Sequence, residues 1–313
     1  MNITSSLLED PSSSDDYLLE QVTRWNIDPG HVAIEVVESG IQSLSVLRRF
    51  VERYRAYGFL IALDDFGASH SNLERLVELK PDIVKIDRHL VSEVHASHYK
   101  RSVVEAINGL CHSLGAISLA EGVEESQELE CLSSLGCDLF QGYLLSHPLE
   151  DYDSSLTEVR KRVLWHASQT ALRIADSARG VHDEITRIVE TGRHLGRELQ
   201  RLSRIDEQLS GLIRRLPDIQ CAYVTDLHGM QITETVFNPS TGTREGVLFR
   251  PARRGADHSL KDYVYHIRSL GAPHFLTGAY LSRATGTLCR TVSVKTYTKE
   301  QTPVILCIDI VQA

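Results

Sequence analysis

The sequence lacks a long apolar run: no stretch among its 313 residues approaches the ~20 apolar residues that a membrane-spanning helix needs. The N-terminal stretch MNITSSLLEDPSSSDD is polar and acidic, unlike a signal peptide. None of the six cysteines pairs in a CxxC motif, which argues against a zinc site and for reduced, mostly buried thiols. These absences predict a cytoplasmic protein without a membrane span.

Positive charge is scarce in the first half of the chain. Residues 1–150 contain 11 Lys and Arg against 24 Asp and Glu, a net charge of −13, whereas residues 151–313 contain 22 against 18, a net charge of +4. So acidic a segment is unsuited to nonspecific binding of duplex nucleic acid. An anionic substrate would need bridging cations there.

Residues 1–150 alternate between β-rich apolar runs and amphipathic helical segments. The expected strands are 31–37, 59–65, 82–87, 116–122 and 137–143, and the expected helices are 17–25, 43–58, 71–80, 99–115 and 126–136. Near-continuous apolar strands between helices are typical of a parallel sheet covered on both faces. The pattern predicts an α/β domain, and polar clusters at the strand ends favour a (β/α)8 TIM-like barrel.

Two further parts follow, a helical connector at 151–215 and a small domain at 216–313. The connector lacks proline over 152–214, and its apolar seam consists of Leu195, Leu199, Leu202, Ile205, Leu209 and Leu212. This spacing suits either a helix packed on its own chain or a dimerising coiled coil. In the last part a helix at 259–271 lies among strands, which predicts an α+β fold. Those strands are expected at 221–234 (two strands around a turn), 275–282, 287–298 and 303–311.

Oxygen-rich phrases follow the apolar runs of the first part. They are Asn2, Glu35-Val-Val-Glu38, Asp64-Asp65-Phe-Gly67, Lys85-Ile-Asp87, Glu121-Gly-Val-Glu124 and Gln141-Gly-Tyr143. Placed at strand ends, they predict one site that suits hard metal ions and phosphate chemistry. The alternative for Asp64-Asp65 is a solvated loop or a helix N-cap. Lys85 would be costly in an apolar barrel unless acidic groups pair with it.

Several of these phrases together carry a family resemblance. DDFG (64–67), KPDIVKID (80–87), AEGVE (120–124) and QGY (141–143) occur with EVVE at 35–38 and the opening MNITSSLLEDP. In order and spacing, residues 1–150 closely resemble the EAL domain, the family of cyclic di-GMP phosphodiesterases. The resemblance implies a modified (β/α)8 barrel that hydrolyses cyclic di-GMP to linear pGpG with Mg²⁺ or Mn²⁺.

The resemblance also implies roles for individual residues. The implied metal ligands are Asn2, Glu35, Asp64 and Asp65. The implied catalytic residues around the metal-bound water are Lys85, Glu121, Asp87 and Gln141. Lys85 is implied to orient the attacking water or hydroxide. The groups implied to hold the loop after Asp65 are Glu38 and Glu124.

The chain also departs from the family pattern. The Glu-Ala-Leu phrase that names the family is absent, Val37 replaces the usual threonine, and the loop at 68–72 reads Ala-Ser-His-Ser-Asn. The sequence begins at what would be the third strand, so we expect a fragment or a gap that another chain covers. Loss of a metal carboxylate predicts slow or no turnover by the chain as given.

The last part more faintly resembles PAS-like or Cache-like sensor domains, through YVTDLHG, ATGTLCRTVSV and a final apolar strand. This resemblance implies a small ligand of unknown identity. Tyr263, Tyr265 and Tyr280 are candidate pocket residues, and the alternative is that they are ordinary core or surface tyrosines.

Three hypotheses remain from the sequence. The chain is a cyclic di-GMP phosphodiesterase, a catalytically degenerate module that senses the nucleotide without cleaving it, or an interaction protein whose acidic half is a relic. Each is compatible with a homodimer made through the connector.

Overall fold

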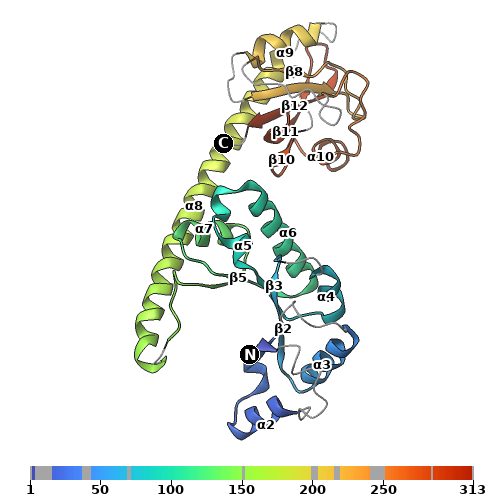
Figure 1. The fold of residues 1–313 in the computed structure, drawn as a ribbon. Coiled ribbons are helices and arrows are strands. Elements are labelled where there is room, and N and C mark those ends of the chain that lie inside the picture. The colour runs from blue at the N-terminus through green and yellow to red at the C-terminus, as the bar shows by residue number, and fades with distance from the viewer. Residues whose placement is uncertain are drawn as a thin grey trace. The chain divides into compact units, whose positions relative to one another are not determined.

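The computed structural model describes residues 2–3, 16–36, 44–68, 72–149, 152–198, 204–214, 219–239, 251–282 and 285–311 (Figure 1). The chain divides into two compact units, Met1–Ser177 and Ala178–Ala313. No helix in the described ranges combines the length and apolarity needed to cross a membrane.

The N-terminal unit is built on a six-stranded parallel sheet in the sequential order β1 to β6. Its strands are β1 (Asn2–Ile3), β2 (Ala33–Val36), β3 (Leu60–Phe66), β4 (Ile83–Ile86), β5 (Ile117–Glu121) and β6 (Leu139–Gln141). Its helices are α2 (Tyr17–Arg24), η1 (Pro29–His31), α3 (Leu44–Ala56), α4 (Asn72–Leu79), α5 (Arg88–Val91), η2 (Val94–Ala96), α6 (His98–Leu114) and α7 (Ser126–Ser134). The expected α/β alternation with a parallel sheet is therefore confirmed.

Apolar patterning explains how these elements pack. The α3 helix buries Leu47, Val51 and Tyr54, which recur every three or four residues and form one face. In β3, residues 61–63 are fully buried before the strand reaches its two aspartates. Because all six strands are parallel, their carboxyl ends, and the polar phrases after them, lie at one edge of the sheet.

Helix α8 (Tyr152–Glu198) begins in the N-terminal unit and continues without interruption through Gly180 and Gly192. At Gly192 an added Cβ would lie 3.0 Å from Val294 Cγ2, so the glycine lets the helix pack closely on a strand. The glycines of this segment therefore neither end nor break the helix.

Helix α9 (Ile205–Ile213) follows α8. Ile205 and Leu209 are each 1% exposed and belong to the core of their own unit, as the first alternative for the apolar seam predicts. The side chains of Leu195, Leu199, Leu202 and Leu212 lie outside the described residues.

The C-terminal unit contains a second six-stranded sheet, ordered β10-β11-β12-β7-β8, with β9 also paired to β11. The strands are β7 (Ile219–Thr225), β8 (Val236–Phe237), β9 (His274–Leu276), β10 (Tyr280–Leu281), β11 (Leu288–Tyr297) and β12 (Pro303–Val311). Every pair is antiparallel. One face packs on the end of α8 and on α9, and α10 (Asp262–Leu270) covers the other (Figure 1).

Two strand predictions for this unit are wrong in detail. In place of one strand at 275–282 there are two short strands, β9 and β10, separated by residues 277–279. The second strand expected within 221–234 is reduced to isolated bridges, such as Thr225 with Gln231. Sequence periodicity over such short runs does not distinguish a strand from a bridged loop.

A buried chain of hydrogen bonds lies on the α10 face of this sheet. The Tyr223 hydroxyl donates to the Tyr263 hydroxyl (2.8 Å), which donates to His258 Nδ1 (3.0 Å). His258 Nε2 donates to Gln231 Oε1 (2.9 Å), whose amide nitrogen in turn donates to Thr233 O. With the Tyr263 hydroxyl as donor, Nδ1 accepts and the imidazole is neutral, in keeping with the lowered pKa of His258.

The stability of this unit is expected to fall as the pH falls below about 6.5, the ordinary pKa of histidine. Burial, together with the charge of Lys261, lowers the pKa of His258. The unfolded chain then binds a proton that the folded chain does not, so acid favours unfolding. The free energy of unfolding, measured by amide exchange in β12 between pH 8 and pH 5, tests this pH dependence. His258→Gln should flatten the pH dependence relative to wild type, and His228→Gln, which alters an exposed histidine, should not.

Candidate functional site

A buried lysine lies at the centre of the acidic strand ends. Lys85 is 5% exposed, and its Nζ is 2.8 Å from Glu121 Oε1, 2.9 Å from Asp64 Oδ1 and 3.1 Å from Glu35 Oε1. Four adjacent strands, β2 to β5, supply these four side chains. The structure therefore brings together residues that the sequence places far apart.

Electrostatics explain why a charge is stable at this depth. Burial alone would lower the pKa of Lys85, but its hydrogen bonds to Glu121, Asp64 and Glu35 outweigh this effect, and the pKa is raised. Burial raises the pKa of Glu121, and this effect outweighs the hydrogen bond and the charge of Lys85, which lower it. An ion cluster of this kind tolerates the low dielectric only while its partners stay together.

Asp64, Asp65 and Glu121 offer carboxylate oxygens that all lie within 4.8 Å of one another. Such a set of hard oxygen donors fits Mg²⁺, Mn²⁺ or Ca²⁺ better than softer ions. The pairing of β3 with β4 shifts register between Leu63 and Phe66, and Asp65 has φ +54°. This irregularity lets two consecutive aspartates serve one site instead of facing opposite sides of the sheet.

Four other predicted residues have positions or contacts that the structure describes. Asn2 pairs with Glu35 in the parallel ladder, which places the backbone of β1 beside the site. Asp87 caps helix α5 by accepting from His89 N (2.7 Å), and Gln141 at the end of β6 has an exposed side chain. Glu124 pairs with Arg88 (2.9 Å). Glu38, the fifth residue of this group, lies outside the described residues.

Sequence reasoning missed Glu128. The residue is 3% exposed, and its carboxylate accepts hydrogen bonds from the backbone N–H groups of Glu93, Glu124 and Glu125. These bonds outweigh the opposing effect of burial, and the pKa of Glu128 is lowered. The available signal was the spacing Glu125-x-x-Glu128 at the start of α7, which is a capping box.

The loop after β5 also approaches the loop after β6 closely, backbone against backbone. An added Cβ at Gly142 would lie 2.1 Å from Val123 O and 2.3 Å from Val123 N. Val123 N donates to Gln141 O (3.0 Å), and Leu144 N donates to Val123 O (3.1 Å). Gly142 is therefore required by the close approach of two site loops.

Gly142→Ala is expected to reduce the free energy of unfolding by about 3 kcal/mol or more, because backbone atoms must shift to admit the methyl group. Gly109→Ala is the matched control, since its Cβ would have no neighbour within 4 Å inside helix α6. That variant should gain roughly 0.5–1 kcal/mol from helix propensity. Urea unfolding of both proteins measures the difference, and equal stability would contradict the described contact.

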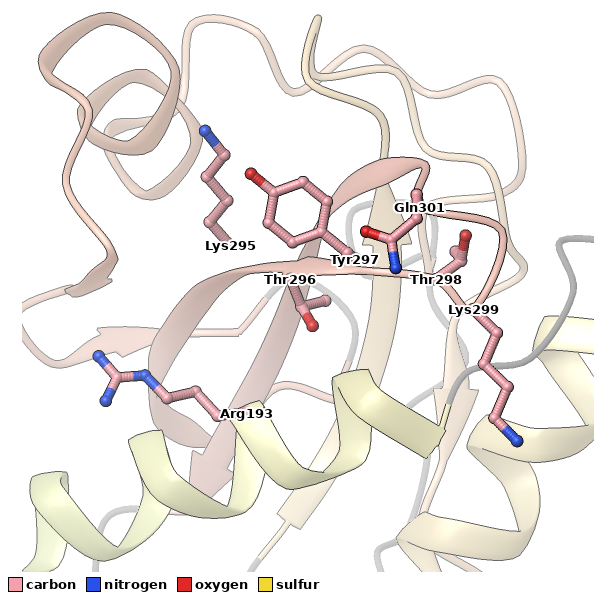
Figure 2. Close-up of a pocket in the computed structure, with 7 residues that line it drawn as sticks. All are labelled: Arg193, Lys295, Thr296, Tyr297, Thr298, Lys299 and Gln301. Carbon is pink, nitrogen blue, oxygen red and sulfur yellow. The ribbon is translucent and has the colours of Figure 1, made fainter.

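A separate cleft of about 470 Å³ lies at the β11–β12 hairpin. Figure 2 shows its lining residues, which are Arg193, Lys295, Thr296, Tyr297, Thr298, Lys299 and Gln301. The side chains of Arg193, Lys295 and Lys299 point in three different directions (Figure 2). Because these charges do not converge, the cleft lacks the geometry of an anion site.

Comparison with known proteins finds a family model whose match spans the acidic site. Residues 1–148 match the model of the EAL domain. Over 132 residues the chain is 34% identical to the cyclic di-GMP phosphodiesterase RocR of Pseudomonas aeruginosa, which covers 42% of this chain and 33% of that protein. Over 126 residues it is 34% identical to the probable cyclic di-GMP phosphodiesterase PdeA of Escherichia coli, covering 40% of this chain and 17% of that protein.

Among solved structures, a match that covers the whole chain was found. It is the Bacillus subtilis YkuI protein, with an EAL domain, in complex with substrate c-di-GMP and calcium. The TM-score is 0.77 at 24% identity, over the whole of this chain and 78% of that chain. At this identity the match establishes a shared fold. The two curated relatives, in contrast, match less than half of this chain, and the matched segments are at most about a third of their own lengths.

Proposed function

We propose, from the premise that residues 1–148 are an EAL domain, that this domain hydrolyses cyclic di-GMP to linear pGpG. The chain as given lacks the family's Glu-Ala-Leu glutamate, so the rate is expected to be low. The observation that carries the proposal is the convergence of Glu35, Asp64 and Glu121 on the buried Lys85 ammonium. The names of the relatives, both cyclic di-GMP phosphodiesterases, support the choice of substrate.

The residues present fit a divalent metal centre. Asp64, Asp65 and Glu121 would hold Mg²⁺ or Mn²⁺ through their clustered oxygens, and the family resemblance adds Asn2 and Glu35 as further ligands. Bound metal supplies positive charge that neutralises the phosphodiester and lowers the pKa of an attacking water. The net charge of −13 in residues 1–150 makes such cations necessary for an anionic substrate.

The chain's own groups have defined tasks in this reaction. Water adds to phosphorus, one of the two ester P–O bonds of that phosphate breaks, and the leaving ribose oxygen takes up a proton. Lys85 donates hydrogen bonds at the point where the acidic side chains meet, so it orients the attacking oxygen and stabilises developing negative charge. Asp87 keeps α5 in place beside the site through its cap on His89 N.

The test is direct hydrolysis by the full chain. Incubation with cyclic di-GMP and Mn²⁺, followed by chromatography, should yield pGpG. Calorimetric titration with the nucleotide distinguishes the enzyme from a catalytically degenerate sensing module. Saturable binding of cyclic di-GMP with no product would indicate the sensing module.

We further propose that the C-terminal unit is a PAS-like or Cache-like sensor for a small ligand, that the chain forms a homodimer and that it is cytoplasmic. The antiparallel sheet with helices on both faces supports the sensor proposal. Tyr263 and Tyr280 have hydroxyls bonded inside the unit, whereas Tyr265 is 48% exposed, so only the first two suit a pocket. Sedimentation equilibrium tests the dimer, and a monomer at all concentrations would contradict it.

A further inference from the structure

The short helix α5 lies between the two loops that carry the acidic site residues. An added Cβ at Gly67, just after Asp64 and Asp65, would lie 2.3 Å from Leu90 Cδ1. An added Cβ at Gly122, just after Glu121, would lie 2.7 Å from Arg88 Cγ. Both loops therefore rest on α5, and a displacement of this helix would move both sets of metal-ligating oxygens.

Glu128 ties the end of α5 to one of these loops. Glu128 Oε1 accepts from Glu93 N (2.9 Å), two residues beyond α5, where the backbone has φ +54°. Glu128 Oε2 accepts from Glu124 N (2.9 Å) and Glu125 N (3.1 Å), in the loop that follows Glu121. One buried carboxylate thus joins two segments that are 31 residues apart, from position 93 to position 124.

An ordinary helix cap does not explain this arrangement. A capping carboxylate satisfies N–H groups at the start of its own helix. Here α7 begins at Ser126, so the amide of Glu93 belongs to another loop altogether. Charge-assisted bonds to three N–H groups are strong, and a neutral replacement cannot reproduce them all.

We propose that Glu128 is a positioning residue for the metal site. Its carboxylate fixes the loop that carries Glu121 and, through α5, the loop that carries Asp64 and Asp65. This inference rests on the proposed function, since it assumes that these residues bind a divalent cation. Groups that orient metal ligands from outside the first coordination layer typically change metal affinity by about 10–100-fold.

The variant Glu128→Gln removes one of the two acceptor oxygens while keeping the size of the side chain. Calorimetric titration of the full chain with Mn²⁺ is expected to show about 10-fold weaker binding. If the chain turns over, kcat should fall more than KM changes, because the groups that act on the phosphate are misplaced. Glu105→Gln is the matched control: it removes the same charge from an exposed position on α6 and should leave Mn²⁺ affinity unchanged. Mn²⁺ affinity of Glu128→Gln equal to that of wild type would overturn the proposal.

Amide exchange of the wild-type chain gives an independent test if Glu128→Gln fails to fold. The amides of Glu93, Glu124 and Glu125 should be protected together, because one carboxylate accepts from all three. Fast exchange of Glu93 N–H with slow exchange of the other two would overturn the proposal. A wild-type chain that binds Mn²⁺ without hydrolysing cyclic di-GMP would contradict the proposed function alone.

Discussion

Replacing Lys85 with methionine is expected to slow hydrolysis of cyclic di-GMP by about 100-fold or more, the usual effect of deleting one preorganised donor from an active site. Methionine keeps the length of the side chain and removes its charge and its three ion pairs. The measurement is kcat at saturating Mn²⁺ and nucleotide. Lys161→Met, which alters an exposed lysine on α8, is the control and should retain full activity.

The same variant should separate two roles of Lys85, catalysis and neutralisation of the buried acidic side chains. Without metal, Lys85→Met leaves three carboxylates facing one another, and removing one partner of a buried ion cluster costs about 3–5 kcal/mol of stability. Mn²⁺ should restore much of that loss, because the cation replaces the ammonium at Asp64 and Glu121. We expect Mn²⁺ affinity to stay the same or increase. Wild-type turnover by Lys85→Met would contradict the assigned role of this residue.

Replacing Asp65 with asparagine is expected to reduce turnover by about 100-fold or more, which corresponds to roughly 2.7 kcal/mol of lost transition-state stabilisation. Asp65 is one of the three residues whose oxygens can surround a cation. Asparagine keeps the shape and tolerates the left-handed backbone at φ +54°. Weaker Mn²⁺ binding with unchanged stability is the expected signature.

Asp65→Ala provides the comparison for the backbone effect. Alanine removes the same ligand, and it also disfavours positive φ, so stability should fall by about 1 kcal/mol relative to Asp65→Asn. If both variants unfolded at the same urea concentration and hydrolysed the nucleotide as fast as wild type, Asp65 would serve neither the metal nor the turn.

The centre of the site could be predicted from sequence because its geometry follows from strand topology. Glu35, Asp64, Lys85 and Glu121 each lie at or near the carboxyl end of a parallel strand, and such ends meet at one edge. The need to neutralise Lys85 also follows from elementary electrostatics. Neither argument requires knowledge of how loops pack.

The surroundings of the site could not be predicted in the same way. The role of Glu128 depends on the amide of Glu93, which reaches it only through the fold. The requirement for Gly142 depends on the backbone of Val123. In the connector, spacing showed an apolar seam but not its partner, and the structure packs Ile205 and Leu209 within their own unit. Local sequence patterns show which face of a helix or strand is apolar, whereas tertiary contacts determine which element covers that face.

The most direct test of the proposed phosphodiesterase activity is product analysis of cyclic di-GMP incubated with the full chain and Mn²⁺. We expect pGpG from the wild type, and about 100-fold less from Lys85→Met and Asp65→Asn under the same conditions. Absence of pGpG from a wild-type chain that binds both Mn²⁺ and the nucleotide would contradict this activity.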